Sequence, residues 1–227
     1  KFVVRYFTRH RRVTTRRVAL FYLLLIFSFF IPMVIGIHFA FSQNAQIDSL
    51  LTLLQNQKED TNKVIILNKL SWEISRSEPE RAFTYASEAE KLSENLNYKM
   101  GLGIAFKNTG WIYANTGENA KALTYYNKAI DEFEKTGHIQ GVAACYGNIG
   151  ITYYFLSSYN QAIEYYMKAL DVFMKSGMKE NIANCYSVIG TVYQEQANYP
   201  KSLEYYFKSL AISQEIGDAA GVAICYS

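Results

Sequence analysis

The stretch that decides the fold is residues 143–182, AACYGNIGITYYFLSSYNQAIEYYMKALDVFMKSGMKENI, because its landmark residues recur every 40 positions. The recurring residues are small or aromatic and form four sets: Cys145, Cys185 and Cys225; Gly110, Gly150 and Gly190; Tyr113, Tyr153 and Tyr193; and Tyr126, Tyr166 and Tyr206. A fixed period of about 20–50 residues is typical of repeat arrays. Such arrays usually present an extended binding surface, so the period favours binding over catalysis.

Each 40-residue unit is predicted to contain two helices. In residues 143–182 the first helix is expected from Ala143 to about Leu156, and the second from Tyr159 to about Lys175, with Gly177 as its C-cap. Along both helices, apolar and small residues recur at spacings of three and four, so each helix has one buried face.

Small and large side chains are expected to pack against each other in this arrangement. Gly150 and Ala162 are predicted where the two helices approach closely, while Tyr153 and Tyr166 are predicted to fill the space between units. Adjacent tyrosines also recur, at 125–126, 165–166 and 205–206. One member of each pair is expected in the core and the other at a half-exposed position, so the tyrosine excess is interpreted as packing.

The recurrence of Gly150, Tyr153, Ala162, Tyr166 and Ala169 resembles the small and large positions of the tetratricopeptide repeat (TPR) family. The resemblance implies an all-α fold, a right-handed superhelical solenoid of antiparallel helix pairs. The 40-residue step is longer than the 34 residues of the common TPR unit, which we interpret as longer helices. The usual proline near the unit's end is missing, and the first unit departs from the pattern, as expected of an end cap.

The units are laid out without gaps. Full units are expected at 63–102, 103–142, 143–182 and 183–222, with a partial unit at 223–227. Residues 43–62 contain IDSLLTLL and predict a lead-in helix. Because the helix that starts at Ala223 has no partner helix, the natural protein is expected to continue past Ser227.

The N-terminus differs in charge from the rest. Residues 1–17 carry seven lysines and arginines and no acid, so a net charge of +3 leaves 3 − 7 = −4 for the remainder. A mildly acidic array lacks the basic face that nucleic-acid binding normally needs, and no nucleic-acid partner is expected.

Residues 18–41 are almost wholly apolar and long enough to span a bilayer as a helix. Two interpretations of residues 18–42 stay open: a signal peptide cleaved at Ala40-Phe41-Ser42, or an uncleaved transmembrane helix that attaches the protein to the membrane. The preceding positive charges predict the same sidedness for both, with the repeats on the non-cytoplasmic side. The protein is therefore expected to be exported, and either periplasmic or anchored in the inner membrane.

No motif for catalysis, metal binding or a cofactor is present. Cysteines 40 residues apart, without CxxC or clustered histidines, do not predict a zinc site and are interpreted as small buried residues. Equivalent positions in successive units should lie about 8–10 Å apart, too far for a disulfide. We therefore expect no catalytic residue, metal or cofactor in this chain, and any kinase-type output domain would belong to a longer protein.

The TPR resemblance also implies a binding surface. In this family, residues of the first helix outside the packing set line a concave groove that binds extended peptides or partner helices. The corresponding residues are Lys107, Trp111, Ala114 and Asn115; Gly147, Ile151, Tyr154 and Phe155; and Ser187, Thr191, Gln194 and Glu195. The alternative is that neighbouring units cover these side chains and use them for packing.

The whole pattern resembles the N-terminal halves of bacterial sensor histidine kinases and related signalling proteins, in which an exported TPR array precedes a second membrane helix and a cytoplasmic output domain. It predicts an exported protein-interaction and sensory module of a larger signal-transduction protein. A self-contained periplasmic adaptor for envelope assembly is the alternative. Expected partners are a protein or peptide in the groove, the membrane through residues 18–41 if they are uncleaved, and a second copy through the uncapped C-terminal repeat.

Overall fold

A computed structural model describes residues 45–226 of the chain. The predicted basic segment 1–17 and the signal or transmembrane segment 18–42 lie outside the described residues. Among the residues that are described, no helix combines the length and apolarity needed to cross a membrane. From Leu50 onward the chain forms one compact unit, and it begins with the helical residues 50–55.

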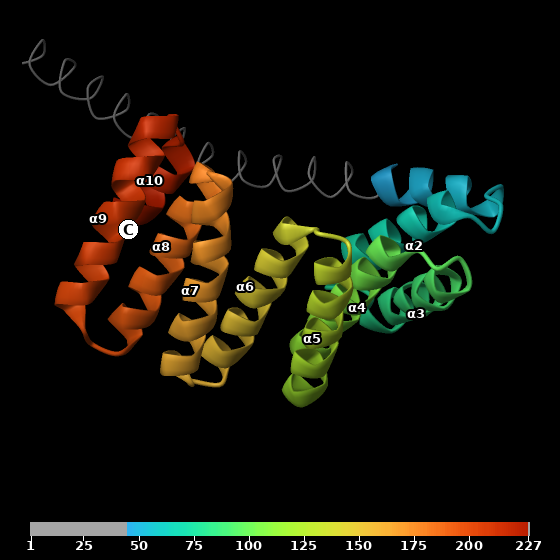
Figure 1. The fold of residues 1–227 in the computed structure, drawn as a ribbon, viewed down its shortest axis with the longest axis horizontal. Helices are drawn as coiled ribbons and strands as arrows, with labels where there is room; N and C mark the ends of the chain where they lie inside the picture. Colours follow the sequence, from blue (N-terminus) through green and yellow to red (C-terminus); the bar gives the residue numbers. More distant parts are fainter. Residues whose placement is uncertain (1–44, 227) are drawn as a thin grey trace, which may run out of the picture. The chain divides into compact units, whose positions relative to one another are not determined.

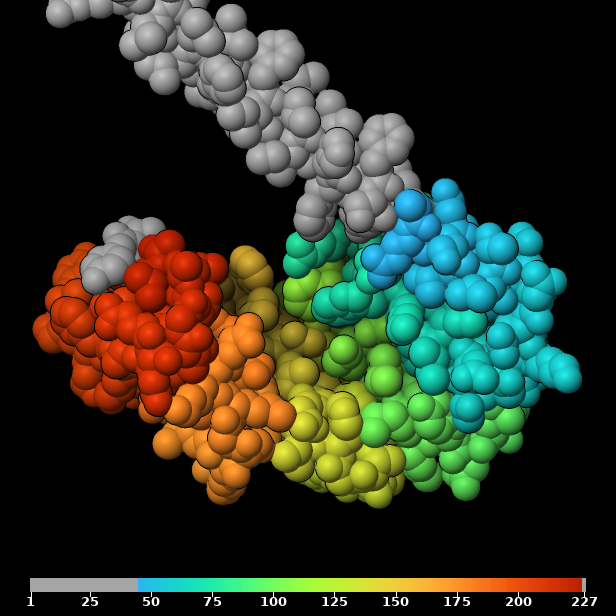
Figure 2. All heavy atoms as spheres, turned by 90° about the horizontal axis from the view of Figure 1, so that it is seen from above, coloured from blue at the N-terminus to red at the C-terminus, as the bar shows by residue number. Residues whose placement is uncertain are grey.

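The described residues are entirely helical apart from short turns and the connection at residues 56–60. The helices that follow this connection are α2 (Thr61–Ile74), α3 (Pro79–Asn95), α4 (Lys99–Asn115), α5 (Asn119–Lys135), α6 (Ile139–Phe155), α7 (Tyr159–Ser176), α8 (Lys179–Glu195), α9 (Tyr199–Ile216) and α10 (Ala219–Tyr226). Consecutive helices run antiparallel and pack side by side (Figure 1). Figure 2 shows the pairs following one another in sequence order, and the all-α repeat prediction is confirmed.

The first helix of each pair also touches the first helix of the next pair. α2 packs on α4, and α4 packs on α6. This second set of contacts gives successive pairs a common face, made by α2, α4 and α6, on which residues of neighbouring pairs come together.

Left-handed backbone at single residues ends the helices from α3 onward. The positive φ angles are at Asn97, Gly117, Gly137, Ser157, Gly177, Ala197 and Gly217. Gly177 is in the left-handed region with φ of 67°, as expected of a C-cap glycine. After Ser157, the N–H of Ser158 donates to the carbonyl of Tyr153 at 2.9 Å, so this turn closes in the same way without a glycine.

The first helix of the 143–182 unit begins earlier than predicted. α6 starts at Ile139, not at Ala143, while α7 starts at Tyr159 as predicted. Gly137 ends α5, and the imidazole Nδ1 of His138 then accepts a hydrogen bond from the N–H of Gly141 at 3.1 Å. This side-chain cap starts the helix four residues upstream of the predicted position, because a capping acceptor decides where a helix begins.

The recurring glycines lie under tyrosine rings. A Cβ atom added at Gly150 would lie 2.7 Å from the Tyr166 ring, and one added at Gly110 would lie 2.7 Å from the Tyr126 ring. The close approach at Gly150 is therefore confirmed. However, Tyr166 covers Gly150 of its own helix pair, so its role is not limited to filling space between units.

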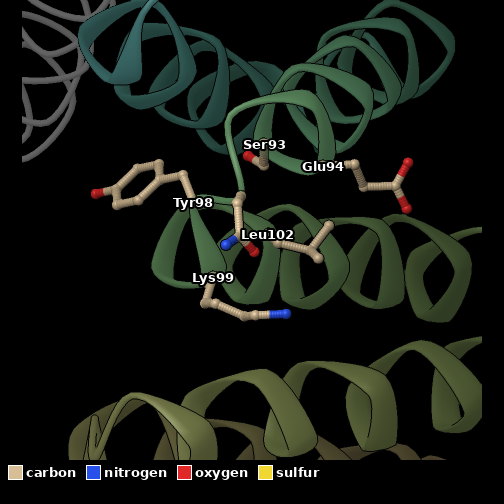
Figure 3. Close-up of a pocket in the computed structure, with 6 residues that line it drawn as sticks. Ser93, Glu94, Tyr98, Lys99 and Leu102 are labelled. Atoms are coloured by element: carbon tan, nitrogen blue, oxygen red, sulfur yellow. The ribbon is translucent and has the colours of Figure 1, made fainter.

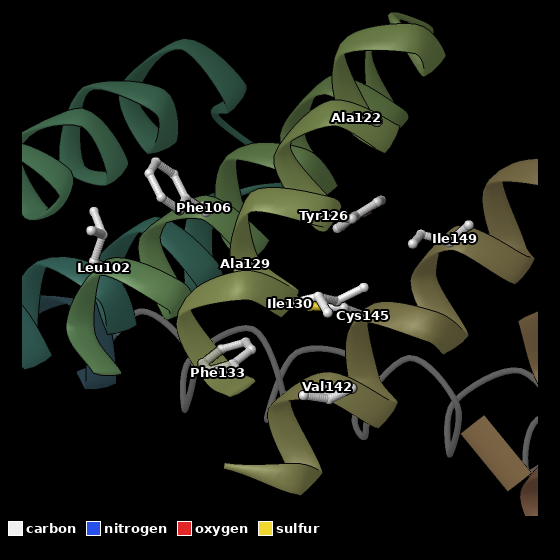
Figure 4. Packing of buried hydrophobic residues seen from close by; sticks show 10 residues of the cluster. All are labelled: Leu102, Phe106, Ala122, Tyr126, Ala129, Ile130, Phe133, Val142, Cys145 and Ile149. Atoms are coloured by element: carbon white, nitrogen blue, oxygen red, sulfur yellow. The ribbon is translucent and has the colours of Figure 1, made fainter. Parts of the chain in front are cut away.

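Tyr126 belongs to a core that joins two pairs. Figure 4 shows it pointing from α5 toward Ile149 of α6. The members of this core come from α4, α5 and α6: Leu102, Phe106, Ala122, Tyr126, Ala129, Ile130, Phe133, Val142, Cys145 and Ile149. Cys145 and Cys185 are buried free thiols, as expected, and burial raises the pKa of each to about 12.

The remaining tyrosines form a repeated stack. Tyr113, Tyr153 and Tyr193 each lie 5.5 Å, between ring centroids, from Tyr125, Tyr165 and Tyr205 respectively. Lysine ammonium groups cover the second ring of each stack, as at Lys168 over Tyr165, 4.2 Å from the centroid. Tyr126 and Tyr166 are buried beside their half-buried neighbours, as predicted, whereas Tyr206 is itself half-buried. The tyrosine excess thus serves packing in the described repeats.

Candidate functional site

Two cavities open on the face made by α2, α4 and α6. The first, of about 250 Å³, lies between α2 and α4 and is lined by Ile65, Asn68, Lys69, Trp72, Glu73, Ile104, Lys107 and Asn108. The second, of about 240 Å³, lies between α4 and α6 and is lined by Trp111, Ala114, Asn115, Gly117, Asn119, Ile151, Thr152 and Phe155. We call the surface lined by these two cavities the groove.

The structure brings several of the predicted site residues together in the groove. Trp111, Asn115, Ile151 and Phe155 share the second cavity, and Lys107 lines the first. The phenyl ring of Phe155 is 77% exposed, which is unusual for so large an apolar side chain. α4 and α6 supply these residues from adjacent helix pairs, so the fold itself creates the cavity.

Tyr154 lies next to Phe155 but lines neither cavity. Its ring contacts Tyr159 of α7, with 6.0 Å between centroids, and its hydroxyl interacts with the carboxylate of Glu195 on α8. Burial, followed by the nearby carboxylate of Glu195, raises the pKa of Tyr154. Tyr154 and Glu195 therefore connect two helix pairs.

The predicted α8 residues are engaged with α9. The hydroxyl of Thr191 lies 3.0 Å from the hydroxyl of Tyr206, and the Tyr206 hydroxyl donates to the side-chain carbonyl of Gln194 at 3.0 Å. Ser187 is half-buried on the same helix and lines neither cavity of the groove. These contacts favour the packing alternative for this part of the predicted surface.

Two tryptophans meet where the cavities adjoin. Trp72 and Trp111 are the only tryptophans of the chain, and their ring centroids are 5.7 Å apart. The ammonium of Lys107 lies 5.0 Å from the Trp72 centroid, and the guanidinium of Arg76 lies 5.5 Å from the Trp111 centroid. The tryptophan pair is therefore flanked by a cation on each ring, an arrangement that cation–π attraction stabilises.

Trp72 and Arg76 were missed by the sequence prediction. The 40-residue step relates Trp111 to Ser71, whereas Trp72 lies 39 residues before Trp111. The one signal that points to their contact is that the chain's two tryptophans fall on the first helices of successive units.

Two buried asparagines tie α2 to α4 beneath the first cavity. The side-chain amide of Asn108 donates to the backbone carbonyl of Asn68 at 2.9 Å, and the amide of Asn68 donates to the carbonyl of Gly101 at 3.0 Å. The side-chain carbonyls of both asparagines are buried without a hydrogen-bond partner. Since the amide groups are spent on backbone carbonyls, these residues position the two helices that form the cavity.

A third cavity, of about 350 Å³, lies at the α3–α4 turn (Figure 3). It is lined by Ser93, Glu94, Asn97, Tyr98, Lys99 and Leu102, none of them a predicted site residue. The ammonium of Lys99 lies 3.8 Å from the carboxylate of Glu132 on α5. Among residues 45–225, no group of three or more His, Cys, Asp or Glu side chains is arranged to hold a metal ion.

Comparison with family models identifies the repeat. Residues 110–175 and 141–215 match the tetratricopeptide repeat model. The chain carries tetratricopeptide repeats. The matches include α5 to α8, whereas α2 and α3 of the atypical first TPR pair lie outside them. The TPR array is therefore, in broad terms, a protein–protein interaction module. No curated protein matches the chain in a sequence comparison.

Solved structures share the fold at low sequence identity. Aspartyl phosphate phosphatase F from Bacillus subtilis superposes with a TM-score of 0.73 at 20% identity, covering 82% of this chain. A Rap protein complexed with competence and sporulation factor gives 0.72 at 18% identity over 83% of this chain. A STAND signal-transduction ATPase with a TPR sensor from Pyrococcus horikoshii gives 0.68 at 20% over 81%. The present chain spans about half the length of the first two, 52% and 54%.

Proposed function

We propose that the TPR array binds an extended peptide, or a segment of a partner protein, in the groove between Lys107 and Phe155. The observation that carries the proposal is the second cavity, where Trp111, Ile151 and the exposed Phe155 surround an unfilled apolar space. Buried aromatic anchors in such pockets dominate the energy of protein recognition. Two structures of similar fold were solved with a bound signalling factor or peptide, which supports this class of ligand.

Tryptophan fluorescence offers a direct test, because both tryptophans of the chain lie in the groove. Peptides selected by the purified chain from a random display library should shift its tryptophan emission and bind saturably. Phe155→Ala and Trp111→Ala should each weaken binding by about tenfold or more, the usual effect of truncating an interface anchor.

Phe207→Ala is the matched control. Phe207 is a phenylalanine on α9 that is 65% exposed and lines neither cavity of the groove. It should leave affinity unchanged, and far-UV circular dichroism should show that all variants keep their helices. Equal loss of binding in Phe155→Ala and Phe207→Ala, or no loss in either, would place the binding site elsewhere.

We further propose that the chain is the exported sensory region of a larger signal-transduction protein, with no catalytic role of its own and with the helix pairs in a right-handed superhelix. The basic residues 1–17 and the apolar residues 18–41 support export, and the TPR sensor in a structure of similar fold supports the sensory role. The periplasmic adaptor remains the competing proposal. A reporter fused after Ser227 should be active when export is required, and a cytoplasmic reporter would contradict the location.

A further inference from the structure

Three cations gather around the tryptophan pair without an acidic partner. Lys69 and Lys107 line the first cavity, and Arg76 covers Trp111. None of the ion pairs formed among the described residues includes any of these three side chains. Glu73 is the acidic residue in this cavity, so the cavity and the adjoining Arg76 together carry an excess of positive charge.

Lys107 is the most constrained of the three. Its side chain is partly buried between α2 and α4, and its ammonium faces the Trp72 ring. Burial lowers its pKa, which shows that the surroundings disfavour the charged form. A partly desolvated ammonium is stabilised most by an ionised oxygen acceptor, since charge-assisted hydrogen bonds strengthen as water is excluded.

The second cavity calls for a different chemistry a short distance away. Its lining contains Trp111, Ile151 and Phe155 and no charged side chain. Lys107 and Trp111 are one helical turn apart on α4, and the cavities lie on opposite sides of that helix. With about 1.5 Å per helical residue and about 8–10 Å between packed helices, the two subsites are roughly 10–12 Å apart, the span of about three to four extended residues.

We propose that the groove selects an extended peptide in which an acidic side chain lies three or four residues from a large apolar side chain. The carboxylate would sit against Lys107 beside the tryptophan pair, and the apolar group would fill the cavity of Trp111, Ile151 and Phe155. This inference rests on the proposed function and names the class of its ligand. Opposite charge in the first subsite and apolar complementarity in the second both contribute to the selection.

The test uses the full chain and designed ten-residue peptides that are acetylated and amidated at their ends. Each carries one glutamate and one phenylalanine, separated by three or four residues, in a neutral Ser/Gly/Ala background. The glutamate peptide should bind at least about tenfold more tightly than its glutamine counterpart, the difference expected of a partly buried charge-assisted hydrogen bond. High salt should narrow this difference only in part, because a desolvated pair is weakly screened.

Variants of the protein assign the effect. Lys107→Met keeps the aliphatic stem and should abolish the preference for glutamate over glutamine. Lys201→Met is the matched control, because Lys201 also covers an aromatic ring, Tyr193 at 5.0 Å, but lines neither cavity of the groove. It should leave the preference unchanged, and thermal unfolding should show that both variants are folded.

The outcomes separate this inference from the proposed function. Equal binding of the two peptides, or a preference that survives Lys107→Met, would overturn the acidic subsite while leaving the groove in place. A charge effect seen only with a free C-terminal carboxylate would assign the subsite to a chain end and overturn the side-chain assignment. Failure of every designed peptide also overturns the inference, whereas library peptides insensitive to Phe155→Ala would instead remove the proposed function.

Discussion

At the residue scale, Gly147 and Gly150 are a matched pair of glycines within α6. A Cβ at Gly150 would meet the Tyr166 ring at 2.7 Å, while nothing lies within 4 Å of one at Gly147. Gly150→Ala should therefore destabilise the fold by about 1–3 kcal/mol through overpacking. Gly147→Ala should stabilise it by about 0.5–1 kcal/mol, because alanine loses less backbone entropy in a helix. Urea unfolding of both variants checks this, and the same sign for both changes would contradict it.

Lys107 supports a second prediction at this scale. Its pKa is lowered from 10.5 by burial, so the unfolded chain holds the proton to higher pH than the folded chain. Removing the charge in Lys107→Met should therefore raise the melting temperature near pH 7. As pH rises through the lowered pKa, the folded lysine loses its proton first and the wild type gains stability relative to the variant.

Thermal unfolding of wild type and Lys107→Met across this pH range provides the measurement, with Lys201→Met as the control. The gap between wild type and Lys107→Met should narrow as the pH approaches 10.5. A gap that stays constant with pH would show that burial of the Lys107 charge does not limit stability.

How far single residues could be predicted depended on their periodicity. The close approach at Gly150 and the buried Cys145 recur in phase, and both predictions were correct. Trp72 escaped because α2 presents its groove residues one position out of the 40-residue register. The alternative partners of Thr191 and Gln194 depend on the Tyr206 hydroxyl reaching across from α9, a tertiary contact that spacing along one helix does not encode.

At the element scale, the start of α6 depends on one side-chain acceptor. The Nδ1 atom of His138 caps the N–H of Gly141, and the imidazole also lies 5.2 Å from the Phe133 ring. His138→Ala should cost about 1 kcal/mol of stability, whereas His138→Asn should recover most of it because asparagine is a strong N-cap.

Amide hydrogen exchange at Gly141 measures the local effect of the cap. Its N–H should exchange faster in His138→Ala and be protected again in His138→Asn. If both variants exchange alike, the Phe133 contact and not the cap would account for the loss.

Helix existence was easier to predict than helix boundaries. Both helices of the 143–182 unit were predicted from their apolar spacing, and the start of α7 was correct. The start of α6 was placed four residues late because histidine is an uncommon cap and gives no strong sequence signal. The left-handed turns at Ser157 and Ala197 were likewise hidden, because the corresponding turn at Gly117 uses glycine.

At the scale of the whole molecule, α9 leaves an apolar face uncovered. Leu203 is 55% and Phe207 is 65% exposed, whereas the equivalent Ile163 and Met167 of α7 are partly buried within a core that α8 completes. The position is therefore shaped to receive a helix, and a two-fold axis would pair this face with itself. Glu204 and Lys208 flank Phe207, so two antiparallel copies of α9 would oppose opposite charges.

We predict that the chain self-associates through this face with increasing concentration. Leu203→Lys with Phe207→Lys should hold it monomeric in sedimentation velocity, because two desolvated charges would replace the apolar contact. Ile65→Lys with Phe155→Lys is the control on the groove and should not alter the association. A wild type that remains monomeric throughout would contradict the prediction.

Predictability at this scale followed from repetition. The period established the helix-pair fold, because each pair repeats the same buried residue types in the same register. It could not establish which exposed side chains form a ligand site, since Trp111 and Thr191 occupy corresponding positions with different neighbours. Export and the fate of residues 18–42 stay predictions of the sequence.

The repeated core also bears on how the length of the gene can change. If residues 143–182 were excised in frame, Val142 would be followed by Ala183, and Tyr126 would face Cys185 and Ile189 in place of Cys145 and Ile149. The same residue types would meet, so replication slippage by one whole unit could shorten the array without opening its core. The groove would be the part to suffer, because Ile151 and Phe155 would be lost and Thr191 and Glu195 would take their places. Unit number is therefore open to drift, while ligand preference would change abruptly with each lost or duplicated copy.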